Sequence, residues 1–211
     1  LDEARVVLSG NVFSKNIDVQ NPKIEGNIIV NYASLEKDYS PKELIKIITQ
    51  FLLKQKARTL KTPLPPIDLD LKLTGNRDIF IISNLAEAEL EANLSVQGDI
   101  NNPKIYGELS AIYGKFGFKD RYFDLVSGNI NFHGLLEPTL DFIGETFIFT
   151  RGGGSVYIIA HITGPVSKPS ITLSSDQNFS QQELLSLITT YQNSQTSSIY
   201  NKNLESKIEL L

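Results

Sequence analysis

The residues that could do chemistry in this sequence are few. His133 and His161 are its two histidines, and it contains no cysteine. Neither histidine lies in a recognisable motif with a nucleophile, so we expect each to be a structural or surface residue. Without cysteine the chain has no thiolate nucleophile, no disulfide and no cysteine-ligated metal.

The acidic and glycine-rich segments do not supply a site either. Asp68, Asp70 and Lys72 alternate with apolar residues, so they share one face of an expected strand and resemble a solvated surface more than an acid–base pair. Residues 151–154 (RGGG) lack the G-x-x-x-x-G-K-[ST] spacing that holds phosphates, and we interpret them as a flexible hairpin. The sequence therefore predicts a protein that is not an enzyme and has no catalytic residues, no metal site and no cofactor.

Composition narrows the class further. The chain has 211 residues, 41% of them hydrophobic and 21% charged, which is typical of a folded globular protein. Its net charge of −4 argues against nucleic acid as a partner. Because the sequence contains no methionine, we expect a fragment or a processed form of a longer protein. Its most apolar stretch, residues 44–53, is interrupted by polar side chains and is too short to span a membrane.

The elements that would position these residues are mostly strands. In residues 67–74 and 88–97 every second side chain is apolar, which is typical of a strand with one apolar and one polar face. Short turns separate the segments of this kind, so we expect an all-β meander of long antiparallel strands. The same pattern predicts further strands at 5–13, 24–32, 105–113, 129–133, 140–150, 156–163 and 170–174.

Proline marks several of the expected strand starts. The hexapeptide NPKIEG at 21–26 returns as NPKIYG at 102–107, with looser echoes at 136–141 and 167–172. Proline cannot donate a hydrogen bond to the neighbouring strand, so it is tolerated at the first residue of a strand. The repeat favours similar strand–turn–strand layers stacked along one axis, although a common way of entering a hairpin would also explain it.

Two segments have the period of a helix. Residues 40–60 and 180–192 each begin with a serine that is followed three residues later by glutamate, a capping box. The first helix is basic and amphipathic, so it can cover the sheet as a lid or lie on an anionic membrane, and we favour the lid. Its apolar stripe, the possible lid contact, consists of Leu44, Ile47, Ile48, Phe51 and Leu52.

A long sheet with one apolar face and few helices leaves several architectures open. The apolar face can close into a sandwich with a dry core, face lipid in a membrane barrel, form an adhesin-like β-solenoid, or curl into a trough that holds acyl chains. The absence of tryptophan and of clear aromatic girdles argues against the membrane barrel.

An ordered series of motifs then resembles a known family. The series has a strand with a positively charged turn at 71–81, an AEL strand from residue 86, the frame F-x-L-x-x-G-x-I-x-F-x-G from Phe123, P-x-L from Pro138, G-x-x-x-x-P-x-I-x-L-S-S from Gly164, and a helix motif at 180–187. From about residue 68 to residue 187, the chain resembles the C-terminal domain of the TamB (translocation and assembly module) family.

The resemblance implies a fold and a cellular setting. The fold is an elongated, curled β-sheet trough with an apolar interior, a β-taco, which we assign to residues 1–179. The expected helix at 40–60 is inserted in it and is a departure from the family pattern. A C-terminal helix follows at 180–192, and then a loosely structured tail at 193–211. The implied setting is a diderm bacterium, in which the full-length protein is anchored in the inner membrane and crosses the periplasm, with this end near the outer membrane.

The resemblance also implies partners. Such proteins resemble bridge-like lipid carriers, so the implied partners are phospholipid acyl chains and an outer-membrane assembly barrel of the TamA or BamA type. The alternative is a β-strand docking or chaperone module that supports outer-membrane protein or autotransporter assembly without conducting lipid. The residues expected to line a lipid groove are Leu69, Leu71, Leu73, Leu90, Leu94, Val96, Leu109, Ile130, Phe132, Ile158, Ile162, Ile171 and Leu173.

Overall fold

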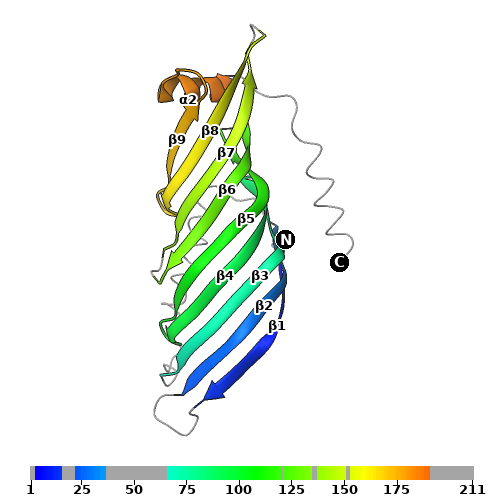
Figure 1. Cartoon of the computed structure of the whole chain (residues 1–211), viewed down its shortest axis with the longest axis vertical. Helices are drawn as coiled ribbons and strands as arrows, with labels where there is room; N and C mark the ends of the chain where they lie inside the picture. The colour runs from blue at the N-terminus through cyan, green and yellow to red at the C-terminus, as the bar shows by residue number, and fades with distance from the viewer. Residues whose placement is uncertain are drawn as a thin grey trace.

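The structure is a computed structural model, and it describes residues 3–15, 22–36, 66–119, 121–134, 137–150 and 153–190. These residues form one nine-stranded sheet with a helix at its C-terminal end (Figure 1). The strands lie in the sheet in chain order, so β1 and β9 are its two edges. The elements are β1 (Glu3–Lys15), β2 (Lys23–Glu36), β3 (Asp68–Ile82), β4 (Ala86–Asp99), β5 (Lys104–Phe118), β6 (Arg121–His133), β7 (Thr139–Phe149), β8 (Ser155–Pro165), β9 (Ser170–Ser175) and α2 (Gln181–Thr190).

Every strand predicted from the period of two is present, and most are longer than predicted. Pro22, Pro103, Pro138 and Pro169 immediately precede β2, β5, β7 and β9, so the repeated proline motif does mark strand entry. The predicted C-terminal helix is confirmed as α2. The predicted inserted helix at 40–60 and the predicted tail at 193–211 lie outside the described residues.

The expectation of a purely antiparallel meander is wrong at one place. Strands β2 and β3 pair in parallel, with Ile24 opposite Leu69 and Ile28 opposite Leu73. Parallel neighbours need a crossover connection of a dozen or more residues, and residues 37–67 supply one. The sheet is therefore mixed, and all its other neighbouring pairs are antiparallel.

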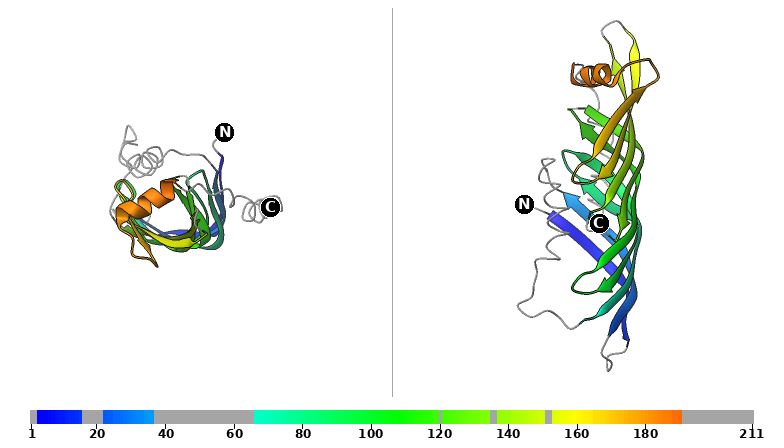
Figure 2. Two further views of the ribbon diagram at one scale, coloured as in Figure 1. Left: turned by 90° about the horizontal axis from the view of Figure 1, so that it is seen from above. Right: turned by 90° about the vertical axis from the view of Figure 1, so that its left-hand side faces the viewer.

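The expectation of a curled trough is also corrected. The sheet is long, twisted and open: β1 and β9 do not meet, and the sheet is neither closed nor strongly curled (Figure 2). Each strand is rotated relative to its neighbour, and over nine strands this rotation produces an elongated ribbon.

A series of register shifts interrupts the strand pairing. They lie between Val7 and Leu8 where β1 meets β2, between Glu89 and Leu90 where β4 meets β5, and between Leu125 and Ser127 where β6 meets β7. Such β-bulges increase the local twist and reset the alternation of side chains.

The turn predicted within 71–81 is a further irregularity of this kind, inside the continuous strand β3, where the pairing with β4 shifts between Gly75 and Ile79. Asp78 has a left-handed φ of 63° there. Its backbone N–H donates a 3.1 Å hydrogen bond to Oε1 of Glu89, which is buried on the neighbouring strand β4. A carboxylate from one strand thus fixes the bulge in the next.

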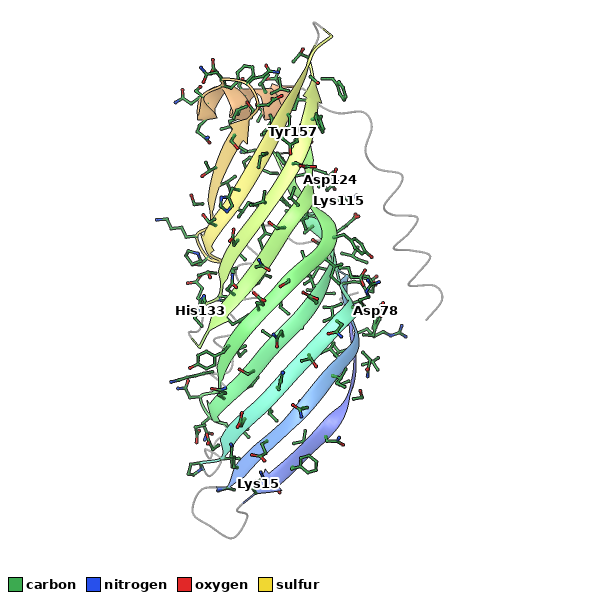
Figure 3. The ribbon with its side chains drawn as sticks, viewed as in Figure 1. Lys15, Asp78, Lys115, Asp124, His133 and Tyr157 are labelled. Carbon is green, nitrogen blue, oxygen red and sulfur yellow. The ribbon has the colours of Figure 1, made fainter. Side chains whose placement is uncertain are left out.

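The pairing register gives the sheet two distinct faces. Leu73 lies opposite Leu94, and Phe142 lies opposite Ile162, and we call the side that these residues share the apolar face. Helix α2 packs on this face. The opposite, polar face carries Lys15, His133 and Tyr157, which are labelled in Figure 3.

Candidate functional site: the apolar face

The apolar face runs across the whole sheet. One row of paired positions crosses five strands, from Ile28 on β2 through Leu73, Leu94 and Gly107 to Phe132 on β6. The register places all the predicted groove residues on this one face. That they contact lipid stays a prediction.

The predicted groove residues differ in their exposure. Ile158 and Leu173 are buried in a core that also contains Leu184 of α2, so these two are packing residues at the helix-covered end of the sheet. Leu69 and Leu90 are also buried. Ile171 is 36% exposed on the edge strand β9. The others are half-buried: Leu71, Leu73, Leu94, Val96, Leu109, Ile130, Phe132 and Ile162.

Helix α2 is held at its start by the predicted capping box. The backbone N–H of Ser180 donates a 2.7 Å hydrogen bond to Oε2 of Glu183, and the Ser180 hydroxyl donates to the same oxygen at 2.8 Å. These two donors stabilise the carboxylate and lower the pKa of Glu183 below its ordinary value. Leu184 and Ile188 then point into the core.

Gln181 attaches α2 to the edge of the sheet. Its Oε1 accepts a 2.9 Å hydrogen bond from the backbone N–H of Leu173, and its Nε2 donates to the backbone oxygen of Leu173. The side chain therefore occupies backbone groups of β9 that would otherwise be available to another strand. This contact was not predictable from the sequence, because a glutamine in the first turn of a helix is ordinary.

Several aromatic residues of the apolar face were not among the predicted groove residues. Phe116 and Phe123 stack with their ring centroids 5.4 Å apart. A side chain at Gly144 would collide with Phe116, and one at Gly128 would collide with Phe142, so these glycines make room for the rings. The signal was present in the sequence, since Phe123 and Gly128 belong to the F-x-L-x-x-G frame.

One charged side chain is buried on the apolar face. Arg121 pairs with Phe118 beside the helix-covered core and is 4% exposed. Among the described residues its Nε and Nη1 have no acceptor. Burial away from water disfavours the charged form and lowers the pKa of this guanidinium.

The candidate chemical residues all lie on the polar face. His161 Nε2 is 2.8 Å from Asp141 Oδ1, and both side chains are largely exposed. Lys23 Nζ donates to Asp70 Oδ2 at 2.7 Å, and this bond raises the pKa of Lys23. They are surface pairs, as the sequence predicted for Asp70 and His161.

A shallow cavity of about 670 Å³ also opens on the polar side, with Asp70, Lys72 and Tyr106 among its lining residues. It lies on the opposite side of the sheet from the apolar face. In the described part of the chain, no group of three or more histidine or acidic side chains could hold a metal ion. Over the same residues, no helix is long and apolar enough to cross a membrane.

Comparison with known proteins gives a family match over nearly the whole chain. The profile of the TamB C-terminal domain matches residues 2–209. A search of curated proteins gives no match.

Proposed function

Because the chain belongs to the TamB family, as its C-terminal domain, we propose that its apolar face shields phospholipid acyl chains on their way to the outer membrane. The family consists of non-enzymatic transport and assembly proteins of the diderm cell envelope, which act with TamA in outer-membrane assembly. In the proposed setting, the full-length protein spans the periplasm from an inner-membrane anchor. This end meets the assembly barrel, of the TamA or BamA type.

The observation that carries the proposal is the half-buried row from Ile28 to Phe132. It continues without a charged side chain across five strands. Moving an acyl chain through water costs about 0.8 kcal/mol for each exposed CH₂, so a lipid tail of a dozen or more carbons faces roughly 10 kcal/mol. An apolar surface of this width removes much of that cost by burial alone, and it needs no catalytic residue.

Charge placed on the apolar face tests the proposal. Leu94→Asp and Phe132→Arg should leave the sheet folded, because both side chains are half-buried, but should abolish phospholipid transfer between vesicles or membranes. The matched control is Asn93→Asp, the adjacent position on the polar face, which should transfer lipid normally. Unfolding of Leu94→Asp would instead identify the face as a dry core, and normal transfer by a folded Leu94→Asp variant would refute the lipid role.

A second function is favoured by a different observation, the free edge of β1. This strand has thirteen residues, and within the described part of the chain it pairs with β2 alone. Val6, Val7 and Leu8 are each about half exposed, at 59%, 49% and 54%. A long apolar edge of this kind can accept an extra strand, so the domain could dock a strand of the barrel or of an incoming client.

Photo-crosslinking at two positions distinguishes strand docking from lipid transport. If strand docking is the function, a photo-crosslinker at Val7 captures the assembly barrel or a client protein in cells, and one at Leu94 captures no lipid. If the domain carries lipid, the crosslinker at Leu94 captures phospholipid whatever Val7 captures.

A further inference from the structure

The hairpin between β7 and β8 extends beyond the rest of the sheet. It projects past α2 at one end of the long axis in both side views (Figures 1 and 2). Its pairing is regular up to Phe149 opposite Ser155, and the backbone N–H of Thr150 donates a 2.8 Å hydrogen bond to Gly154. The hairpin is therefore an ordered projection at least as far as these residues.

The two faces of this hairpin have opposite environments. Ile148 and Val156 lie on the apolar face and are buried under α2, at 0% and 3% exposure. Phe147 and Phe149 lie on the polar face and are 51% and 69% exposed. Because Ile148 and Val156 pack against α2 on one face of the hairpin, the two phenyl rings on its other face point away from the core.

A third, partly buried ring packs beside these two. Tyr157 lies opposite Phe147, with the ring centroids 5.0 Å apart. Its hydroxyl donates a hydrogen bond to Glu145, and this bond is the main cause of the raised pKa of Tyr157. The hydroxyl of Tyr157 is thus hydrogen-bonded to the Glu145 carboxylate within the hairpin.

We propose that this aromatic tip, formed by Phe147, Phe149 and Tyr157, inserts into the surface of a lipid bilayer. Aromatic side chains concentrate at the boundary between lipid headgroups and acyl chains, where an apolar ring is buried without a deep insertion. A membrane is the occupant that fits the size of the tip. Two phenyl rings that are more than half exposed, with the partly buried ring of Tyr157 beside them, offer at most a few hundred Å², well below the roughly 800 Å² per partner of a stable protein interface.

Few charged side chains lie close to the aromatic tip. From Glu145 to Tyr157 the sequence contains one acidic residue, Glu145 itself, and one basic residue, Arg151. The Tyr157 hydroxyl donates to Glu145, and the Tyr157 backbone N–H donates a 3.3 Å hydrogen bond to Oδ1 of Asp176, so both of these carboxylates lie at the Tyr157 side of the cluster. The inference deepens the proposed function, because a lipid carrier has to touch the membrane with which it exchanges lipid.

The absence of tryptophan from the chain allows a direct optical test. Phe149→Trp introduces a single reporter at the tip, and Phe13→Trp introduces a matched reporter at a ring that is 61% exposed on β1. Upon addition of vesicles of phosphatidylethanolamine and phosphatidylglycerol, the emission of Trp at 149 should shift to the blue and be quenched by brominated acyl chains. The emission of Trp at 13 should not change.

A binding measurement completes the test. The double variant Phe147→Ser, Phe149→Ser should reduce co-sedimentation with these vesicles by at least about tenfold, because two phenyl groups lose their apolar burial. Phe13→Ser should reduce it less than about twofold. Unchanged emission at 149, or equal losses in the two serine variants, would overturn the proposal. The groove variant Leu94→Asp should still bind vesicles, so failure of transfer and failure of membrane contact are distinguishable.

Discussion

The same alternation of apolar and polar side chains leads to different burial at the two ends of the sheet. At the helix-covered end, Ile158 and Leu173 of the apolar face are buried against Leu184 of α2. At the other end, Leu71 and Leu94 follow the same alternation but remain half-buried. The alternation therefore specifies which side chains share a face, but not how deeply each is buried: Leu69 and Leu90 are buried on the same face without being part of the core under α2.

This difference assigns different roles to the two ends. The helix-covered end has the side-chain packing of a protein interior and stabilises the fold. For the half-buried row from Ile28 to Phe132 we propose contact with another apolar molecule, because a folded protein exposes a continuous apolar surface chiefly where it binds something. Three predictions test the contrast.

The largest expected effect is on stability at the helix-covered end. Ile158→Ala should lower the free energy of unfolding by about 3 kcal/mol, because the site is fully buried and cannot collapse around the cavity. Leu94→Ala, at the other end, should cost about 1 kcal/mol, because its side chain is only half-buried. Urea unfolding measures both values. Equal losses would mean that the two ends are packed alike.

A smaller effect is expected at the edge of β9. Gln181→Ala removes both hydrogen bonds to the backbone of Leu173 and should cost about 1 kcal/mol. Amide exchange at Leu173 should accelerate, while exchange at the opposed position Ala160 changes less. Gln181→Glu keeps the acceptor and should preserve part of the protection of the Leu173 N–H. Unchanged exchange at Leu173 in the alanine variant would show that Gln181 does not guard this edge.

The smallest effect concerns pH and the start of α2. The pKa of Glu183 is lowered in the folded state, so its contribution to stability is complete above the ordinary glutamate pKa of about 4.3 and is lost as the pH falls below that value. The melting temperature of Glu183→Gln should therefore lie below that of the unmodified chain at pH 7, and the difference should narrow as the pH falls through the lowered pKa of Glu183. A difference that stays constant as the pH is lowered would contradict the assigned cause.

Much of this architecture was predictable from local residue patterns. The period of two located every strand, and the Ser180–Glu183 pair located the start of α2. The proline motif located four strand starts. These features succeed because the physics behind them acts between residues that are close in the sequence: alternation across a strand, helix capping, and the missing N–H of proline.

The features that were not predictable depend on distant contacts. Strand β3 could pair with β2 in either the parallel or the antiparallel direction. The alternation of apolar and polar side chains is the same in both cases, so it does not predict which one forms. The bulge at Asp78 resembled a turn, because its stabilising partner, Glu89, lies on another strand. Similarly, nothing in the sequence of α2 showed which part of the apolar face it would cover.

The most direct test of the central claim is lipid capture at two adjacent positions. A photo-crosslinking amino acid is placed at Leu94, on the apolar face, and in a second variant at Asn93, on the polar face. The full-length protein is irradiated in cells, and covalently bound phospholipid is quantified by mass spectrometry. If the apolar face carries acyl chains, the variant at position 94 captures phospholipid and the variant at position 93 does not. Equal capture at both positions, or capture of protein alone at position 94, would contradict the account.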